Sequence, residues 1–224
     1  MDILYTDDQI LVIDKPAGIP VLPDGWEQDA PYLVKMLEEE FGKLWVVHRL
    51  DKGTSGVMIF ARNAESHRAL NTQFENHEAM KTYHAIVEGN PKWDEKVTKF
   101  PLRANVGKKH RTAVDDKNGK PSETHFRVIK RYQDAALIEA KPMTGRTHQI
   151  RVHAYALGHP LLGDILYSAK ETWLITRPAL HAQTLSLIHP VTKERMKFTA
   201  PHPADFDEAL KNIEAGYFTA SIDD

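Results

Sequence analysis

The segment of this chain best suited to chemistry is His48-Arg49-Leu50-Asp51, followed by the turn-forming residues 52–56. It places a carboxylate beside cations, between the apolar runs 45–47 and 57–61. Short apolar runs that are bounded by turn residues predict buried strands. We therefore expect Asp51 to lie in a loop that the core fixes at both ends. Such a carboxylate needs a cation or hydrogen bonds, because an isolated buried charge is strongly destabilising. For the Asp taken alone, a role that only caps the turn is the simpler interpretation.

A second segment, residues 144–153, supplies a candidate cation. A helix is predicted over residues 147–157, and on it the side chains of His148, Arg151 and Tyr155 share one face, because they lie at i, i+3 and i+7. Arginine suits a poorly solvated ion pair because it stays charged and offers two parallel donors. We predict that Arg151 is the counter-ion of Asp51. This pair would keep Asp51 ionised, and hence nucleophilic, at neutral pH.

The elements that must position these residues follow from hydrophobic periodicity and turn chemistry. Two hairpins are predicted near the ends of the chain, 3–13 and 180–200, and a third over residues 123–141, with a further strand over 81–88. Helices are predicted over residues 31–41, 63–77, 147–157 and 203–215. The pattern predicts an α+β fold, with a mixed, mainly antiparallel central sheet and helices packed on it. We expect a single catalytic domain over residues 1–216 and a frayed tail over 217–224.

Composition narrows the class of protein. The 224 residues include no cysteine, which excludes disulfides, thiolate zinc sites and a cysteine nucleophile, and fits a reducing compartment. The sequence contains neither a signal-peptide pattern nor a run long enough to span a bilayer, so we expect a soluble, cytoplasmic protein with no membrane partner. The net charge is −2. Residues 99–131, however, carry ten basic and three acidic side chains, which favours a polyanion-binding region as much as a solvated loop.

Several separated motifs resemble those of the RluA-type RNA pseudouridine synthases, in the same order and over most of the chain. The first is His48-Arg49-Leu50-Asp51 with Thr54-Ser55-Gly56, the second is Lys81-x-Tyr83, and the third is Gly145-Arg146-x-His148-Gln149-x-Arg151-x-His153. Further similarities are Lys15-Pro16-x-Gly18, Leu162-Gly163-Asp164-x-x-Tyr167, Leu180-His181-Ala182 and Phe198-x-Ala200-Pro201. The resemblance implies a pseudouridine-synthase-like α+β fold and an isomerase that converts specific uridines in structured RNA.

The resemblance also implies residue roles. Asp51 attacks the flipped uridine or stabilises its cleaved sugar, so that uracil turns and rejoins through carbon 5. Tyr83 stacks on the base and is a candidate for the proton abstraction, Arg151 pairs with Asp51, and Arg49 helps fill the gap left by the nucleotide. No metal or cofactor is needed. We expect rRNA or tRNA as partner, no obligate protein partner and a monomer. The expected RNA-binding residues are Arg49, His48, Arg146, His148, Lys81, Lys108, Lys109 and Arg111.

Many relatives carry an added RNA-binding domain, for which the 224 residues leave no room, so target choice is expected to come from the catalytic body. The sequence leaves two alternative functions open. A zinc enzyme built on His148 and His153 is disfavoured, because five residues apart on a helix these side chains do not share a face. A non-catalytic RNA-binding module is the stronger alternative, although it would need neither Asp51 nor Arg151.

Overall fold

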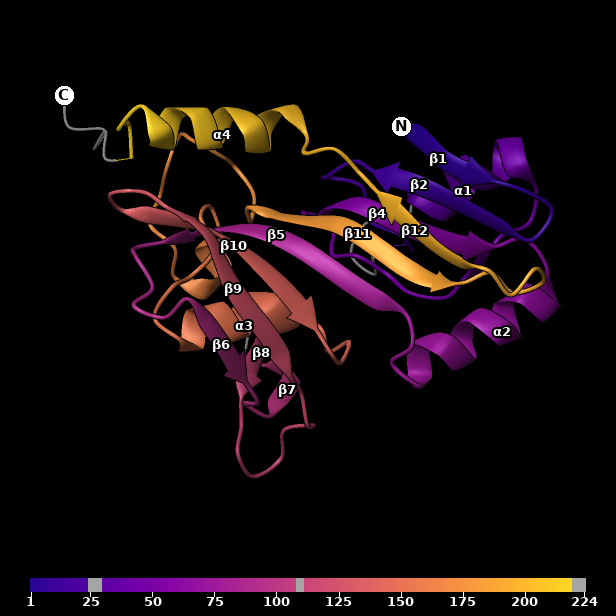
Figure 1. Cartoon of the computed structure of the whole chain (residues 1–224), viewed down its shortest axis with the longest axis horizontal. Helices are drawn as coiled ribbons and strands as arrows, with labels where there is room; N and C mark the ends of the chain where they lie inside the picture. The colour runs from indigo at the N-terminus through magenta and orange to yellow at the C-terminus, as the bar shows by residue number, and fades with distance from the viewer. Residues whose placement is uncertain (24–29, 108–110, 219–224) are drawn as a thin grey trace. The chain divides into compact units, whose positions relative to one another are not determined.

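The computed structural model describes residues 1–23, 30–107 and 111–218, and the chain divides into two compact units (Figure 1). The first unit comprises Met1–Lys81 and Ala182–Pro201, and the second comprises Thr82–His181 and His202–Asp224. Each unit is therefore built from segments that are far apart in the sequence. The predicted single catalytic domain over residues 1–216 stays a prediction, and most of the predicted frayed tail lies outside the described residues.

The first unit holds an antiparallel sheet in which β2 (Ile10–Lys15) lies between β1 (Asp2–Thr6) and β4 (Ser55–Ala61). On the far side of β4 follows β11 (Leu180–Ile188), which pairs with β12 (Arg195–Thr199), while the short β3 (Trp45–Val46) pairs with β4. Every residue of β4 is buried, so this strand runs through the core. The helices are α1 (Leu33–Phe41), which ends at Gly42, and α2 (Ala64–Glu75). Asn63 caps α2, because its side chain accepts a hydrogen bond from the Ser66 N–H at 2.8 Å.

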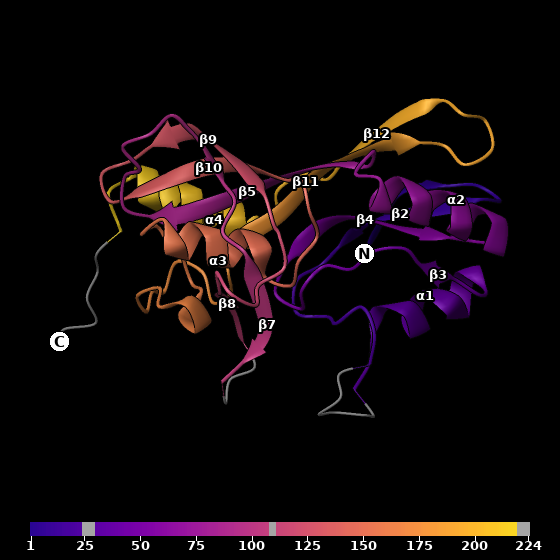
Figure 2. The same cartoon turned by 90° about the horizontal axis from the view of Figure 1, so that it is seen from below.

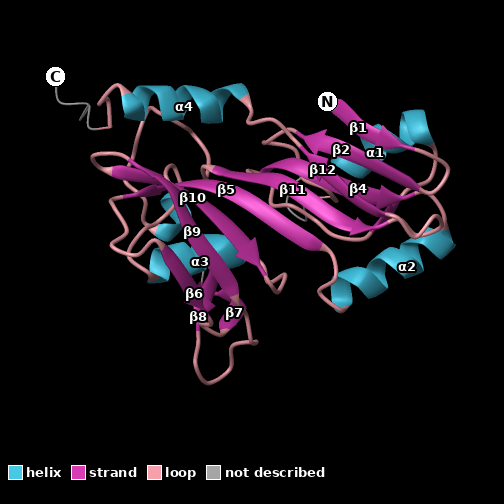
Figure 3. Ribbon diagram, viewed as in Figure 1, coloured by secondary structure: helices cyan, strands magenta, loops and turns pink. Residues whose placement is uncertain are grey.

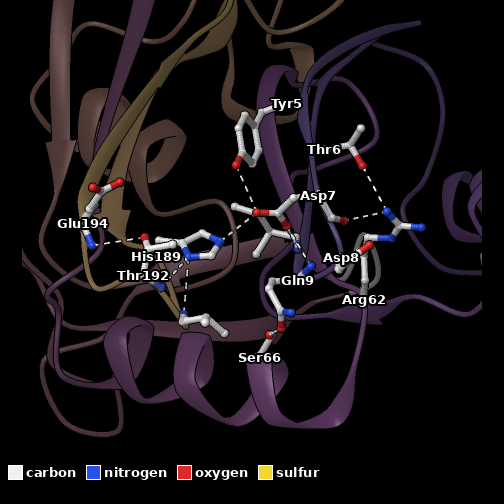
Figure 4. Close-up of polar contacts among 12 residues, drawn as sticks. Tyr5, Thr6, Asp7, Asp8, Gln9, Arg62, Ser66, His189, Thr192 and Glu194 are labelled. Atoms are coloured by element: carbon white, nitrogen blue, oxygen red, sulfur yellow. Dashed lines mark hydrogen bonds and ion pairs between the residues drawn. The ribbon is translucent and has the colours of Figure 1, made fainter.

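A polar cluster joins two turns of this unit that are 182 residues apart in sequence (Figure 4). Asp7, in the β1–β2 turn, accepts hydrogen bonds from the backbone N–H groups of Gln9 and Ile10 and from the Tyr5 hydroxyl. Its other contact is with Nε2 of the buried His189, at 2.9 Å. Nδ1 of His189 accepts from the Thr192 N–H, so Nε2 carries the proton and donates to Asp7. The cluster thus fixes the β1–β2 turn against the β11–β12 turn.

The second unit holds a sheet in the order β5 (Met80–Glu88), β10 (Ala135–Pro142), β9 (Thr124–Arg131) and β6 (Glu95–Thr98), all antiparallel. A separate two-stranded ribbon is formed by β7 (Leu102–Val106) and β8 (Arg111–Val114), and it runs beside α3 (Gln149–Ala156) (Figure 2). The remaining helices are the short 3₁₀ helix η1 (Ile165–Tyr167) and α4 (Ala204–Glu214).

Helices α3 and α4 cover opposite faces of this sheet. Ile150 and Ala154 of α3 pack with Ala85 and Val87 of β5 and with neighbouring residues of β10. Phe206, Ala209 and Ile213 of α4 instead pack with Ile86 and Leu137, whose side chains point to the other face because successive strand residues alternate. Both faces near β5 and β10 are therefore buried, which explains the continuous apolar runs 85–87 of β5 and 135–138 of β10.

The predicted α+β class is confirmed, since helices pack on mainly antiparallel strands (Figure 3). All four predicted helices are present, and α3 is shorter than predicted because His148 adopts a left-handed conformation just before it. Residues 92–121, whose sequence predicts turns and weak strands, contain the short strands β6, β7 and β8. In the described residues no helix is both long and apolar enough to span a membrane.

Candidate active site

Asp51 lies where the sequence predicted, in the loop between β3 and the buried β4, and it is half-buried. The backbone turns at this residue, because its carbonyl accepts a hydrogen bond from the Thr54 N–H at 3.0 Å. The carbonyl of the next residue, Lys52, accepts from the Gly18 N–H at 2.7 Å. The Asp51 loop is thus tied to the segment that follows β2.

The side chain of Lys15 binds the backbone of this loop. Its side chain is fully buried, and its ammonium donates hydrogen bonds to the carbonyls of Pro16 at 2.9 Å, Thr54 at 2.9 Å and Lys52 at 3.4 Å. Lysine is rarely buried unless its charge is compensated, and three carbonyl dipoles provide that compensation here. Because two of these carbonyls belong to residues one and three positions after Asp51, Lys15 limits the movement of the loop and places a cation against its backbone.

Gly56 permits the close packing that fixes the far end of the loop. Its φ of +111° suits glycine, and a Cβ atom at this position would lie 2.3 Å from the carbonyl oxygen of Ala182 in β11. No side chain fits between these backbones. The start of β4 is therefore held directly against β11.

His48 and Lys81, from two different motifs, meet at Phe74 within the first unit. The His48 ring stacks on the Phe74 ring with centroids 4.8 Å apart, and the Lys81 ammonium lies 5.9 Å from the same ring centre. Nε2 of His48 accepts a hydrogen bond from the Ile59 N–H at 3.2 Å. Burial, with the nearby Lys81 charge, lowers the pKa of His48 to about 3, and burial also lowers the pKa of Lys81. His48 is therefore a neutral ring held in place by its neighbours, and it directly precedes the exposed Arg49.

Tyr83 lies in β5, opposite Ala140 of β10 in the strand register. It is half-buried and packs against the apolar cluster that α3 shares with the sheet. Its side chain is thus on the same face of the sheet as α3, the helix that carries Arg151.

The start of α3 is fixed by Gln149. Its side-chain carbonyl accepts hydrogen bonds from the Thr144 hydroxyl at 2.6 Å and from the Arg146 N–H at 3.0 Å. Its amide donates to the Glu123 carbonyl and to the Thr124 hydroxyl, both at 2.9 Å. One buried amide therefore holds the loop of the third motif against the start of β9.

Arg151 forms a buried, bidentate ion pair with Asp164. Its Nε donates to one carboxylate oxygen at 2.6 Å and its Nη2 to the other at 2.8 Å, and the two side chains are only 9% and 1% exposed. The guanidinium also lies over the Tyr167 ring, 5.0 Å from its centre. This geometry combines an ion pair with a cation–π contact in a site with little water.

The predicted polar face of α3 converges on Tyr167. Nδ1 of His148 lies 2.9 Å from the Tyr167 hydroxyl, and the Tyr155 ring centre lies 6.2 Å from that of Tyr167. The same hydroxyl accepts a hydrogen bond from the Thr112 N–H of β8 at 3.0 Å. Tyr167 thus links the β7–β8 ribbon to His148 and Arg151, and burial raises its pKa.

Comparisons with known proteins point to one family. A family model described as RNA pseudouridylate synthase matches residues 9–156. Ribosomal large subunit pseudouridine synthase D of Zymomonas mobilis is 35% identical over 230 residues, covering 95% of this chain and 73% of that protein. The dual-specificity RNA pseudouridine synthase RluA of Escherichia coli is 38% identical over 206 residues, covering 91% and 93% of the two chains. The solved structure of human RNA pseudouridylate synthase domain containing 4 superimposes with a TM-score of 0.76 at 27% identity, covering 94% and 92%.

The chain belongs to the RluA-type RNA pseudouridine synthases. It is therefore an isomerase that acts on uridine in RNA, as the motifs predicted. The roles of the individual site residues stay predictions. Within this pseudouridine synthase, His48 and Lys81 lie together in the first unit, and His148 and Arg151 lie together in the second. Asp51 and Arg151 belong to different units, so their pairing is a proposal and is taken up below.

The basic region of the synthase, residues 99–131, carries less unpaired positive charge in the folded chain than its sequence suggests. At least five of the ten basic residues between positions 99 and 131 form ion pairs, and three of the partner acids lie outside this segment. The pairs are Lys99–Glu123, Arg103–Asp115, Arg127–Glu139, Lys130–Glu214 and Arg131–Asp94. Arg111 is exposed on β8, Arg146 is exposed and its Nε donates to the Pro121 carbonyl, and Lys108 and Lys109 lie outside the described residues.

Sequence reasoning missed the supporting residues Lys15, Phe74, Gln149, Asp164 and Tyr167. Four of them lie in segments that resemble the family, namely Lys15-Pro16-x-Gly18, the third motif with Gln149, and Leu162-Gly163-Asp164-x-x-Tyr167. A lysine at the end of an apolar strand, and an aspartate within a leucine-rich turn, are the signals that could have indicated buried charges. In the described residues no three His, Asp or Glu side chains gather to hold a metal ion.

Proposed function

We propose that this pseudouridine synthase modifies specific uridines of structured rRNA or tRNA, with Asp51 as the catalytic group. The observation that carries the assignment is the fixation of the Asp51 loop by Lys15 and by the close contact at Gly56. A reactive group gains rate when it is held in one geometry, because the cost of orienting it is met during folding. The named relatives support an rRNA or a broader RNA substrate.

The proposed chemistry starts with a flipped uridine, because a stacked base cannot present its glycosidic bond to a carboxylate. Asp51 either attacks the sugar or stabilises it after the bond to uracil breaks. Tyr83 stacks on the base and abstracts the proton from carbon 5 after rejoining. Arg151 acts as counter-ion to the Asp51 carboxylate, and Arg49 fills the space left by the nucleotide. Phosphate contacts come from Arg111, Arg146, Lys108 and Lys109.

The test uses RNA labelled with tritium at carbon 5 of uridine, because rejoining at that carbon releases the label. Asp51→Asn is expected to release no tritium while keeping its thermal midpoint and its RNA affinity, because an amide is not a nucleophile. Asp8→Asn, which changes an exposed carboxylate of the same unit, is the matched control and is expected to stay active. Turnover by Asp51→Asn would contradict the assignment, and RNA binding without turnover by the unmodified protein would favour a non-catalytic module.

We also propose that the enzyme works as a monomer in the cytoplasm. A map of pseudouridines in total RNA, from cells with and without this chain, identifies the substrate directly. Loss of a site in rRNA or tRNA supports the proposal, whereas loss only in another RNA class contradicts it. Light scattering of the purified enzyme, alone and with RNA, tests the oligomeric state.

A further inference from the structure

The Arg151–Asp164 pair has a feature that the proposed mechanism does not use. The Asp164 carboxylate accepts hydrogen bonds from Nε and Nη2, which form one edge of the guanidinium, and the central carbon of this group lies over the Tyr167 ring, 5.0 Å from its centre. A planar guanidinium that donates two parallel hydrogen bonds along one edge has a single orientation. Nη1, which is not part of this pair, is therefore presented in one fixed direction.

Asp164 is itself held by the backbone turn that carries Tyr167. The Asp164 N–H donates to the Leu161 carbonyl at 3.0 Å, and its carbonyl accepts from the Tyr167 N–H at 2.9 Å. Gly163 allows this turn, since its φ is +74° and a Cβ there would lie 2.4 Å from the Arg177 carbonyl oxygen. One short turn thus supplies both groups that fix the guanidinium, which explains why they are three residues apart in the sequence.

We propose that Asp164 is a positioning residue for Arg151 in the isomerisation, assisted by the Tyr167 ring. The inference rests on the proposed role of Arg151 as the partner of Asp51. A long arginine side chain that is anchored only by its own rotamers must be ordered at each turnover, and that ordering has an entropic cost. The pair with Asp164 removes this cost beforehand, so that Nη1 is already oriented when the substrate arrives.

The second unit offers a matched control for this proposal. Arg177 pairs with Asp205 through the same Nε and Nη2 edge, at 2.7 Å and 2.9 Å. Asp205, at the start of α4, is not part of the proposed catalytic or RNA-binding set. An Asp-to-Asn change there removes the same kind of charge from the same kind of fork, without touching Arg151.

The experiment measures the tritium-release rate with saturating enzyme in single turnover, together with the RNA dissociation constant and the thermal midpoint. The variants are Asp164→Asn, Arg151→Gln, their double variant and Asp205→Asn. Asp164→Asn is expected to slow the rate about tenfold and to change the RNA affinity less than about twofold. The reason is that the substitution weakens the charged hydrogen bonds that orient Arg151, and one such bond corresponds to roughly tenfold in rate. Asp205→Asn is expected to keep the unmodified rate. A loss of folded protein alone would lower the active fraction and not the rate constant.

The double variant tests whether Asp164 acts through Arg151. If it does, adding Asp164→Asn to Arg151→Gln causes no further loss of rate, and this comparison remains informative where Asp164→Asn alone does not fold. A further loss in the double variant, or an unmodified rate in Asp164→Asn, overturns the proposal. Turnover by Asp51→Asn or full activity of Arg151→Gln would instead refute the proposed function, so the two failures are distinguishable.

Discussion

Replacement of Arg151 by methionine tests how much the buried ion pair contributes to stability. The change leaves the Asp164 carboxylate, which is 1% exposed, without its bidentate partner, and it also removes the cation from the Tyr167 ring. Breaking one side of a buried pair costs about 3–5 kcal/mol, whereas methionine retains most of the packing of the arginine stem. For a protein of this size that loss corresponds to a fall in the thermal midpoint of roughly 6–20 °C.

The assay is urea unfolding at neutral pH, followed by fluorescence, for Arg151→Met beside Arg177→Met. The Arg177–Asp205 pair has the same donor geometry, but Asp205 is 46% exposed, so the loss of this ion pair is expected to cost about 1 kcal/mol or less. Arg177→Met also removes the Nη1 hydrogen bonds to the Pro178 and Leu180 carbonyls, so the buried Asp164 carboxylate should make Arg151→Met the less stable variant by about 1 kcal/mol or more. Equal and small losses in both would refute the reasoning, because the carboxylate of Asp164 would then be stable without its cation.

Two other predictions concern the first unit. Because the folded state lowers the pKa of His48 to about 3, the neutral ring stabilises the fold fully above its ordinary pKa near 6.5, and this stability is lost as pH falls towards 3. His48→Gln should therefore lose less unfolding free energy than the unmodified protein between pH 7 and pH 4; equal losses would show that His48 is not buried as a neutral ring. Gly56→Ala should cost more than about 4 kcal/mol, because its Cβ would overlap the Ala182 carbonyl. Gly158→Ala, which has a positive φ but open space, should cost about 1–2 kcal/mol, and similar midpoints for the two glycine variants would contradict the close approach.

Local structure was predictable wherever short-range signals agreed. The first hairpin, the Asn63 cap of α2 and the Gly42 end of α1 follow from turn and capping residues, and the structure confirms them. The β9–β10 hairpin is confirmed for the same reason, since its turn residues separate two apolar strands. These features depend on contacts between residues that are near in the sequence, with strand partners no farther apart than Thr124 and Pro142 of the β9–β10 hairpin.

The strand order was not predictable, because it depends on contacts between distant segments. β4 lies next to β11, more than a hundred residues later in the chain, and at Gly56 the backbones approach so closely that a Cβ atom would overlap Ala182. Nothing adjacent to Gly56 in the sequence distinguishes this constraint from an ordinary turn glycine. The same limit applies to β7 and β8, since the polar, turn-rich sequence predicts weak strands there without indicating that these two pair with each other.

The candidate site shows the same division between local and distant information. Periodicity placed His148, Arg151 and Tyr155 on one face of a helix, and the structure brings all three to Tyr167. The acidic partner of Arg151 could not be predicted, because any of the 31 acidic residues could have paired with the guanidinium. Helical spacing predicts which side chains share a face, but only the turn geometry around Asp164 identifies what that face contacts.

The ion pairs of the basic region change how RNA binding should be understood. Arg127 pairs with Glu139, and Arg131 pairs with Asp94, so each cation that turns towards a phosphate leaves a carboxylate behind. Each such surface ion pair is worth about 1 kcal/mol or less, so a phosphate can displace the carboxylate at little cost in free energy. If the proposed RNA-binding role of this region holds, each exchange leaves an acid beside the RNA, and that acid repels the neighbouring phosphates. We therefore expect these pairs to weaken non-specific affinity while leaving the cations available, so that the fixed residues of the site contribute more to the choice of uridine.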